Sequence, residues 1–420
     1  MTRLAPDHRA LHDVVVVGGG LVGASLAIAL DRVGVDVALV EPTPAGALPE
    51  VFDQRNLSFA EATVNALSAL GVMRLLRTAP GPIRRIHVSR RGDFGRVRLS
   101  ADQYGRESFG QVVVARDLGD ALEARLAECR HLTRYRPARF VGFDAPPDHT
   151  ETRVLRIADA EGEHRIAARL VAAADGTRSG VRDALGIAAR EHDYGQTLLV
   201  ARVRAEQAPD GTAYERFGPD GPTALLPRGD RHFGAIHAVP SDDAARVLAL
   251  DDAGFLQRLQ DAFGWRVGRL LSCGPRSAHA AMRLVAERTV AERAVLVGNA
   301  AQTVHPIGAQ GFNLGLRDAL TLAEMIEAEG IGAAAGENGP DSGDGLLARY
   351  ARRRSEDRER TLAFSDGLAR MTSNRSGTGA ALRALGFAAV DRLPALQAQL
   401  VGGAMGYRGD VPALCRGEAA

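Results

Sequence analysis

Residues 14–23 read Val-Val-Val-Val-Gly-Gly-Gly-Leu-Val-Gly and form the most informative stretch of this sequence. The β-branched run Val14–Val17 predicts a buried parallel strand, and Leu21–Val33 predicts a helix. A second strand is expected at Val35–Val40, directly before Glu41. Together these segments predict a β-α-β unit at the start of the chain, which is the building unit of nucleotide-binding α/β folds.

The glycines Gly18, Gly20 and Gly23 lie between this strand and this helix with the spacing GxGxxG. The first permits a tight turn, the second lets the backbone approach a pyrophosphate, and the third lets the helix pack on the strand. The phosphates would sit at the helix N-terminus, where free N–H groups favour anions. Glu41, at the end of the second strand, is placed to accept hydrogen bonds from an adenosine ribose. The pattern predicts a dinucleotide site but does not separate FAD from NAD.

Two later motifs favour a flavin. Ala174-Asp175-Gly176 follows one predicted strand, and residues 295–302, VLVGNAAQ, follow another. Residues 305–315, HPIGAQGFNLG, form a second glycine-rich loop that opens a helix. A helix N-terminus aimed at the polar edge of a flavin ring would stabilise the negative charge that reduction places there.

In this order the three motifs resemble those of the class A FAD-dependent aromatic hydroxylases. Residues 298–320, GNAAQTVHPIGAQGFNLGLRDAL, are most similar to the ubiquinone-biosynthesis branch, and in particular to 2-polyprenyl-6-methoxyphenol hydroxylases. The resemblance covers nearly the whole chain. It implies an FAD-dependent monooxygenase that NADH or NADPH reduces, and whose flavin C4a-hydroperoxide hydroxylates the ring of a polyprenylated methoxyphenol.

The resemblance also implies roles for individual residues. Pro306 and the backbone of Gly311 would line the place where the substrate meets the flavin. The cofactor-binding residues that it implies are Gly18, Gly20, Gly23, Glu41, Arg55, Gln111, Arg116, Asp175, Asn299, Gly311, Phe312 and Asn313. This chain departs from many relatives in carrying Asn299 where they carry Asp. It also reads Gly308-Ala309 where they read Ala-Gly, so a slightly reshaped loop is expected.

The pattern changes between residues 194 and 239 to several short strands with glycine and proline turns, which predicts an antiparallel sheet. Helices are expected at Glu61–Arg77, Arg116–Cys129, Phe255–Phe263 and Asn313–Ala328. We therefore predict an α/β fold in which a Rossmann-like FAD-binding domain is interwoven with an antiparallel-sheet substrate domain and followed by a helical C-terminal region. The predicted boundaries are 10–80, 105–188 and 285–345 for the FAD-binding domain, 81–104 and 189–284 for the substrate domain, and 346–420 for the helical region.

Composition narrows the classes of partner. Basic and acidic residues number 52 and 51 in a chain of 420, so no overall field favours nucleic acid. The three cysteines, Cys129, Cys273 and Cys415, lie far apart, which predicts neither a metal site nor a disulfide framework and favours a cytoplasmic protein. The chain has no lysine, which excludes Schiff-base catalysis. No long apolar stretch predicts a membrane span, so any membrane contact would be peripheral.

Some alternatives stay open at this point. The rival enzymes are a sister hydroxylase of different regiochemistry and a hydroxylase of a small soluble aromatic, and the non-enzyme rival is a non-catalytic scaffold that retains FAD. The expected partners are a lipophilic phenol and O₂, and residues 381–406 either pack on their own domain or contact a membrane or another quinone-pathway enzyme. His305 is expected to be structural rather than a proton donor. For Tyr194, Tyr214, Phe217, Leu225 and Leu226, the sheet core is favoured over a substrate pocket.

Overall fold

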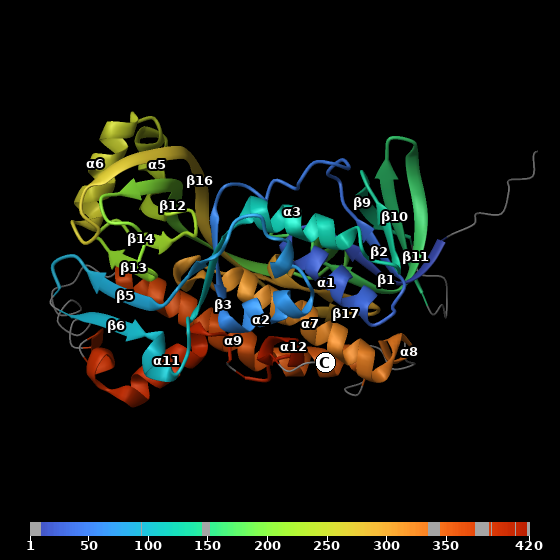
Figure 1. The fold of residues 1–420 in the computed structure, drawn as a ribbon. Coiled ribbons are helices and arrows are strands. Elements are labelled where there is room, and N and C mark those ends of the chain that lie inside the picture. Colours follow the sequence, from blue (N-terminus) through green and yellow to red (C-terminus); the bar gives the residue numbers. More distant parts are fainter. Residues whose placement is uncertain are drawn as a thin grey trace, which may run out of the picture.

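The computed structural model describes residues 10–93, 95–144, 152–334, 345–373, 386–387, 389–407 and 409–417. Figure 1 shows an elongated molecule with one sheet at each end, and two long helices, α7 (Gln310–Glu329) and α9 (Leu346–Ser373), run along one side between them. The α/β class is confirmed. The predicted domain boundaries stay a prediction.

The first sheet is the nucleotide-type sheet, with strand order β17-β18-β11-β1-β2-β8. At its centre β1 pairs in parallel with both β2 and β11, and Val14–Val17 are at most 4% exposed. This burial on both faces explains why the strand reads as a continuous valine run. The bounds are β1 Ala10–Val17, β2 Val37–Val40, β8 Leu132–Tyr135, β9 Arg139–Phe143, β10 Arg153–Asp159, β11 Gly162–Ala173, β17 Val290–Ala291 and β18 Ala294–Leu296.

Helices cover this sheet and close its core. A cluster of buried apolar side chains joins α1 (Leu21–Arg32), α3 (Ala115–Leu126) and α7 to one face of the sheet. The predicted helix Glu61–Arg77 is too long, because α2 ends at Ala69 and Gly71 follows with a φ of 76°, a conformation that breaks a helix. Short helices complete this end of the molecule: η1 Met73–Leu75, α4 Gly180–Ala184, α8 Ile331–Ala334 and α12 Ala413–Arg416.

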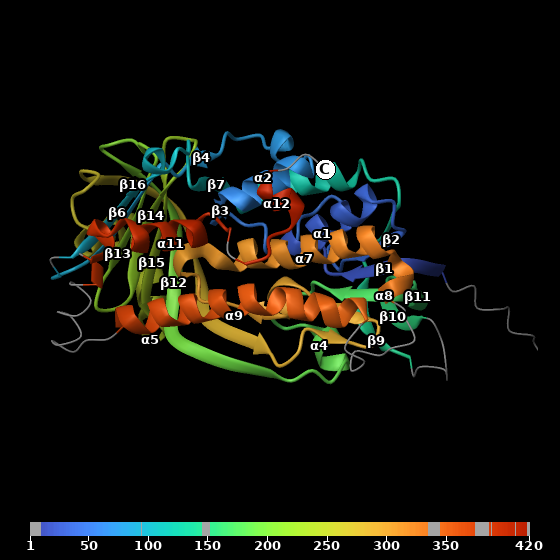
Figure 2. The same cartoon turned by 90° about the horizontal axis from the view of Figure 1, so that it is seen from below.

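The second sheet has the order β19-β16-β12-β15-β14-β13-β5-β6 and is antiparallel except between β13 and β5. Its longest strands, β12 and β16, have 17 residues each and extend from this sheet toward the other, as Figure 2 shows. The bounds are β5 Arg85–Arg90, β6 Arg96–Ser100, β12 Ala189–Ala205, β13 Thr212–Phe217, β14 Pro222–Pro227, β15 Phe233–Pro240, β16 Leu270–Ala286 and β19 Gln302–Thr303. Two helices, α5 (Ser241–Leu248) and α6 (Asp252–Phe263), pack on it.

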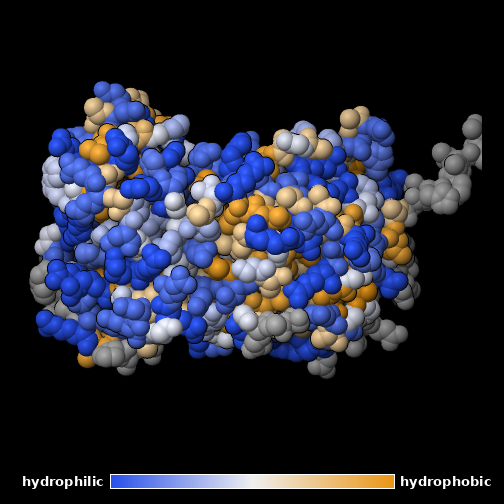
Figure 3. Space-filling view, in the orientation of Figure 1, coloured by the Kyte–Doolittle hydropathy of each residue, from blue (hydrophilic) through white to orange (hydrophobic). Residues whose placement is uncertain are grey.

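A three-stranded sheet of β3 (Asn56–Ala60), β7 (Gly110–Val114) and β4 (Gly81–Pro82) is the third sheet of the fold. The turn η2 (Ala101–Tyr104) precedes β7. Figure 3 shows apolar side chains gathered near the middle of one face, around α1 and α2, with polar surface at both ends.

The chain after α9 is helical where it is described. Residues 386–387 and 389–392 are helical, and α11 spans Pro394–Ala404. Part of the segment 381–406, namely 381–385 and 388, lies outside the described residues, as do residues 335–344 before α9. None of the described helices combines the length and the apolar character that a bilayer crossing requires.

Candidate active site

The predicted nucleotide residues follow strand ends that lie in one row. The register pairs Val17 with Val40 on one side and with Ala173 on the other, and Ala173 with Leu296. The residues that follow these four carboxyl ends therefore meet at one edge of the sheet, where ligands bind in open α/β sheets. They are Gly18, Glu41, Asp175 and Asn299, each within three residues of its strand end.

The three glycines differ in what requires them. Gly18 has a φ of 103°, and a Cβ there would lie 2.6 Å from the carbonyl oxygen of Ala174. A Cβ on Gly23 would lie 1.9 Å from the carbonyl oxygen of Gly18, so the helix packs on the turn only without a side chain. Gly20 has an ordinary extended backbone, and its Cβ would meet only Val51 at 3.6 Å. The protein itself does not need glycine at position 20, so the space beside it fits a bound ligand.

Glu41 is buried and bonded to the glycine loop. One carboxylate oxygen accepts a hydrogen bond from the amide of Gly19 at 2.7 Å, and the other accepts one from the amide of Thr43 at 2.8 Å. Each oxygen can accept a second hydrogen bond, such as one from a ribose hydroxyl. The carboxylate thus orients the glycine loop as well as facing the site at its edge.

Asp175 is only half satisfied. Its Oδ2 accepts a hydrogen bond from the amide of Val181 at 3.1 Å, while its Oδ1 is buried without a partner among the described residues. Burial raises the pKa of this carboxyl above its usual value. A buried acceptor without a partner is costly unless a ligand satisfies it.

The fourth strand end, that of β18, is packed against α7. Gly298 has a φ of 59°, and its amide donates to Asp318 at 3.3 Å. A Cβ on Gly315 of α7 would lie 2.9 Å from the Cα of Gly298, so the helix touches this turn directly. The side chain of Asn299 is exposed at the same edge of the sheet. Its amide is free to bond a hydroxylated ligand.

The loop before α7 has an unusual backbone. Gly308 and Ala309 are both left-handed, with φ values of 73° and 52°, and Ala309 is the residue directly before the helix. Alanine in this conformation costs roughly 1–2 kcal/mol relative to the right-handed form. The order Gly308-Ala309 therefore places an alanine, and not a glycine, in the second left-handed position and makes the loop backbone less favourable there. The first amides of α7, at Gln310 and Gly311, have no acidic or side-chain cap in the structure.

Asn313 fixes the start of α7. Its Oδ1 accepts from the amide of Ala60 at 2.9 Å and from the hydroxyl of Thr63 at 2.6 Å, and its Nδ2 donates to the carbonyl oxygen of Ser58 at 3.0 Å. Nδ2 also donates to the carbonyl oxygen of Ala309 at 2.6 Å, so the protein uses all four hydrogen bonds of this side-chain amide and only the backbone is available to a ligand. Phe312 packs on Phe59, with ring centroids 5.4 Å apart.

The remaining predicted residues lie in or next to the small sheet: Arg55 directly before β3, Gln111 in β7 and Arg116 at the start of α3. Arg55 forms a double ion pair with Asp53, with Nε–Oδ1 and Nη2–Oδ2 both at 2.8 Å. The amide of Arg116 donates to the carbonyl oxygen of Asp53 at 2.9 Å, so Arg55 and Arg116 are close, and the Arg116 side chain is exposed. Gln111 pairs with Phe59 across β3 and β7, and its Oε1 is buried without a partner among the described residues. Asn313 links this sheet to α7.

A cavity of about 700 Å³ adjoins the loop before α7. Its walls come from one face of the second sheet, from residues 305–310, and from α9 and the helical segments after it. The lining is mainly apolar and includes Pro306, Tyr214, Phe217 and Leu226. Three of the five residues that were expected to be sheet core therefore line this cavity. Leu225 points instead into the core on the other side of the sheet.

His305 lies in the same wall, 1% exposed, and burial lowers its pKa to about 4. Its Nδ1 accepts from the amide of Ile307 at 3.1 Å, so the neutral ring carries its proton on Nε2. The Tyr194 ring meets it edge-on at 4.6 Å, and the Tyr194 hydroxyl donates to Asp366. A neutral, packed ring supports the structural role that the sequence favoured.

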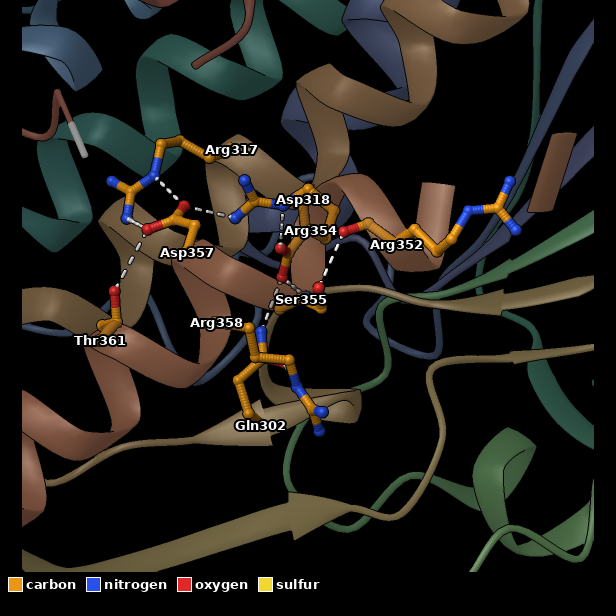
Figure 4. A network of polar contacts seen from close by, with 10 residues as sticks. Gln302, Arg317, Asp318, Arg352, Arg354, Ser355, Asp357, Arg358 and Thr361 are labelled. Carbon is orange, nitrogen blue, oxygen red and sulfur yellow. Dashed lines mark hydrogen bonds and ion pairs between the residues drawn. The ribbon is translucent and has the colours of Figure 1, made fainter. Parts of the chain in front are cut away.

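A buried network of charges joins α7 to α9, as Figure 4 shows. Arg317 pairs with Asp357, and Arg354 reaches both Asp318 at 2.9 Å and Asp357 at 2.7 Å. Although burial alone would raise it, the pKa of Asp357 is held below its usual value by the two guanidinium groups. Arg317 and Asp357 also line the cavity, so the network forms part of its wall.

The network extends to the segment that follows β18. The Gln302 side chain donates to Asp318 at 2.6 Å and accepts from Arg358 at 2.8 Å. Arg317 and Asp318 belong to the motif at residues 298–320, but the motif predicts no role for them. The sequence does not point to Arg354 or Asp357, nor to Glu215, which is a further carboxyl in the cavity wall.

The similarity of this chain to known proteins agrees with a nucleotide site at this edge of the sheet. Residues 12–365 match the family model described as "FAD binding domain". The chain is 35% identical over 396 residues to the ubiquinone hydroxylase UbiL of Rhodospirillum rubrum, covering 94% of this chain and 89% of that protein. It is 29% identical over 403 residues to the 3-demethoxyubiquinol 3-hydroxylase of Escherichia coli, covering 94% and 98%.

Among solved structures, p-nitrophenol 4-monooxygenase PnpA from Pseudomonas putida DLL-E4 has the same fold. It superposes with a TM-score of 0.77 at 18% identity, covering 96% of this chain and 99% of that one. The family match includes helix α7 and the strand ends that precede Gly18, Glu41, Asp175 and Asn299. The alignments with the relatives cover nearly the whole chain. The chain therefore belongs to the FAD-binding domain family and is a class A flavoprotein hydroxylase.

Proposed function

We propose that this protein is an FAD-dependent monooxygenase that hydroxylates the aromatic ring of a polyprenylated phenol on the route to ubiquinone. The observation that carries the proposal is the apolar cavity whose wall includes the loop before α7. That cavity adjoins the predicted flavin site and is large enough for a drug-sized apolar ligand. The names of the relatives, which include ubiquinone hydroxylases, support the substrate class.

The FAD-binding residues are part of this proposal. The space beside Gly20 and the free amides at the start of α1 fit a pyrophosphate, and Glu41 fits the adenosine ribose. The unpartnered oxygen of Asp175 and the exposed amide of Asn299 fit the hydroxyls of the chain that joins pyrophosphate to flavin. When bound and reduced by NADH or NADPH, FAD would activate O₂ for transfer of one oxygen atom to the ring.

The further contacts we propose are with the flavin end of the cofactor. Arg55, before β3, Gln111, in β7, and Arg116, at the start of α3, would approach it, and Gln111 offers a buried acceptor without a partner among the described residues. The backbone of Gly311, Phe312 and Asn313 contacts the ring, whose reduced charge the uncapped N-terminus of α7 stabilises. Pro306 and the backbone of Gly311 would line the place where the substrate meets the ring and help to keep water away from it.

The experiment that tests this function is a substrate series. Purified protein with FAD and NAD(P)H is given 2-methoxyphenols with progressively longer prenyl chains, and coupled hydroxylation is measured. Burial contributes about 25 cal/mol for each Å² removed from water, so KM should fall with each isoprene unit until the cavity is filled. A flat response together with efficient hydroxylation of the unprenylated phenol would favour a hydroxylase of small soluble aromatics. NAD(P)H oxidation without product from any phenol would contradict the function.

A lipophilic substrate needs a route into the cavity, and we propose that it enters from a bilayer that the C-terminal helices touch. Phe387, Val390 and Leu400 line the cavity on this side. Leu393 and Leu396, between them in sequence, are 50% and 39% exposed. Replacing both exposed leucines with Asp should weaken sedimentation with phospholipid vesicles while leaving turnover of a short-chain phenol unchanged.

A further inference from the structure

Glu215 stands on an otherwise apolar surface. On β13, Ala213, Glu215 and Phe217 occupy alternate positions on one side of the strand, and all three line the cavity, as does Tyr214 between them. The register places Val88 of β5 and Ala224 of β14 directly beside Glu215. A carboxyl at the centre of this face breaks the rule that inward positions are apolar. Such exceptions are expected at functional sites.

The carboxyl of Glu215 has no partner in the described part of the chain. No hydrogen bond or ion pair reaches it, and its open side faces the cavity. Burial raises its pKa to about 7, with no neighbouring charge contributing. The other ionisable groups in the cavity wall are Tyr214, His305 and the pair Arg317 and Asp357, which bond to each other. An unpaired carboxylate in apolar surroundings destabilises the fold, so its position is best explained by a ligand.

We propose that Glu215 binds the hydroxyl group of the phenolic substrate and accepts its proton. This inference rests on the proposed function, because it requires a phenol in the cavity. The phenol donates a hydrogen bond to the carboxylate, and this single polar contact fixes which ring position faces the loop at Pro306. The prenyl chain then lies along the apolar wall.

The proton transfer balances without any other reactant. The O–H bond of the phenol breaks, its proton goes to a carboxylate oxygen of Glu215, and the electron pair stays on the phenolate oxygen. That pair is donated into the ring, which makes the ring carbons ortho and para to the oxygen better nucleophiles toward an electrophilic oxygen. After hydroxylation the phenolate recovers the proton from Glu215. Glu215 therefore acts as a general base in addition to positioning the ring.

The first test measures binding. Holoprotein is titrated by calorimetry with 2-geranylphenol and with its O-methyl ether, which has the same shape but no proton to donate. Wild type should bind the phenol about 10- to 100-fold more tightly, the range for one hydrogen bond to a charged group. In Glu215→Leu the two ligands should bind equally. In the matched control Glu327→Gln, which changes an exposed glutamate at the far end of α7, the ratio should not change.

The second test separates positioning from base catalysis. Glu215→Gln keeps an acceptor of the same shape but cannot take a proton. Its binding of the phenol should be within a few-fold of wild type, while its coupled hydroxylation falls and NAD(P)H oxidation without product rises. Wild-type turnover should rise with pH through about 7, the pKa of Glu215, and the variant should lose this step.

The inference is overturned if Glu215→Leu discriminates phenol from ether as wild type does, or if wild type does not discriminate them. Wild type that discriminates the two ligands but hydroxylates no phenol would contradict the proposed function and leave the role of Glu215 in binding supported. The thermal unfolding temperature of each variant is measured as well. In the two Glu215 variants it should equal or exceed that of wild type, since an unpaired, partly buried carboxyl has been removed, and in Glu327→Gln it should not change.

Discussion

Arg317 and Asp357 form a bidentate ion pair that is closed off from solvent, with Nε–Oδ2 at 2.7 Å and Nη2–Oδ1 at 3.0 Å. Their side chains are 3% and 1% exposed. The pair connects α7, which follows the loop at residues 305–309, to α9, the long helix before the C-terminal region. The position of the cavity wall relative to α7 therefore depends on this contact.

Removing one partner of this pair should destabilise the fold strongly. We expect Asp357→Ala to lower the free energy of unfolding by about 3–5 kcal/mol, because it leaves the Arg317 charge buried and unpaired. Chemical denaturation measures the change. Glu356→Ala is the control, because Glu356 pairs with Arg360 on the exposed face of the same helix, with side chains 55% and 57% exposed. The control should cost under about 1 kcal/mol. Equal losses in the two variants would show that burial does not govern this pair.

Substitutions at Gly20 and Gly23 should have different effects, the first on cofactor binding and the second on stability. Gly20→Val should lose FAD but keep the unfolding temperature of the cofactor-free protein, because its side chain enters the ligand space and meets no backbone. Gly23→Ala should lower that temperature, because its Cβ would lie 1.9 Å from the Gly18 carbonyl oxygen. FAD absorbance after gel filtration and calorimetry of the stripped protein separate the two effects. Retention of FAD by Gly20→Val would refute the pyrophosphate assignment.

Asp175 should matter for the cofactor more than for folding. Asp175→Asn has the same shape and can still accept from the Val181 amide, so we expect its thermal stability to be close to wild type. FAD affinity should fall by about 10-fold or more, the loss expected for one hydrogen bond to a charged group. Asp183→Asn, at a side chain 71% exposed, is the control. A drop in stability as large as the drop in affinity would mark Asp175 as structural.

Acid should destabilise the protein through buried histidines. Burial, reinforced by Arg258, lowers the pKa of His237 to about 4, whereas an unfolded histidine titrates near 6.5. Between these values only the unfolded chain binds the proton, so stability is fully present above about pH 6.5 and is lost as pH falls toward 4. His237→Gln should reduce the slope of stability against pH in this window. The exposed His131→Gln should not, and an unchanged slope in His237→Gln would contradict the assignment.

The nucleotide half of the site could be predicted because its signals are local. The valine run, the glycine spacing and Glu41 lie within one β-α-β unit, and the strand register places them as expected. The structure brings Asp175 and Asn299 to the same edge because their strands flank the same central sheet.

The missed residues depend on information that the local pattern does not contain. The sequence of α9 reads as a charged, solvated helix, and its Glu356–Arg360 pair is indeed exposed. On its other face, Arg354 and Asp357 are buried only because α7 packs there. Glu215 reads as a polar residue of a half-exposed strand, and only the register with β5 and β14 shows that it faces the cavity.

The strand order has a consequence for how the chain is made. Val171 of β11 pairs with Ala294 of β18, and Val22 beside the glycine loop packs against Gly298 and Gly315. A nascent chain that has left the ribosome as far as β11 therefore exposes an unpaired sheet edge and the side of helix α1 that α7 later covers. Such long-range contacts slow folding and leave partly folded chains prone to aggregation. The glycine loop is synthesised first, but the turn at Gly298 and the helix α7 that pack beside it are synthesised nearly 300 residues later.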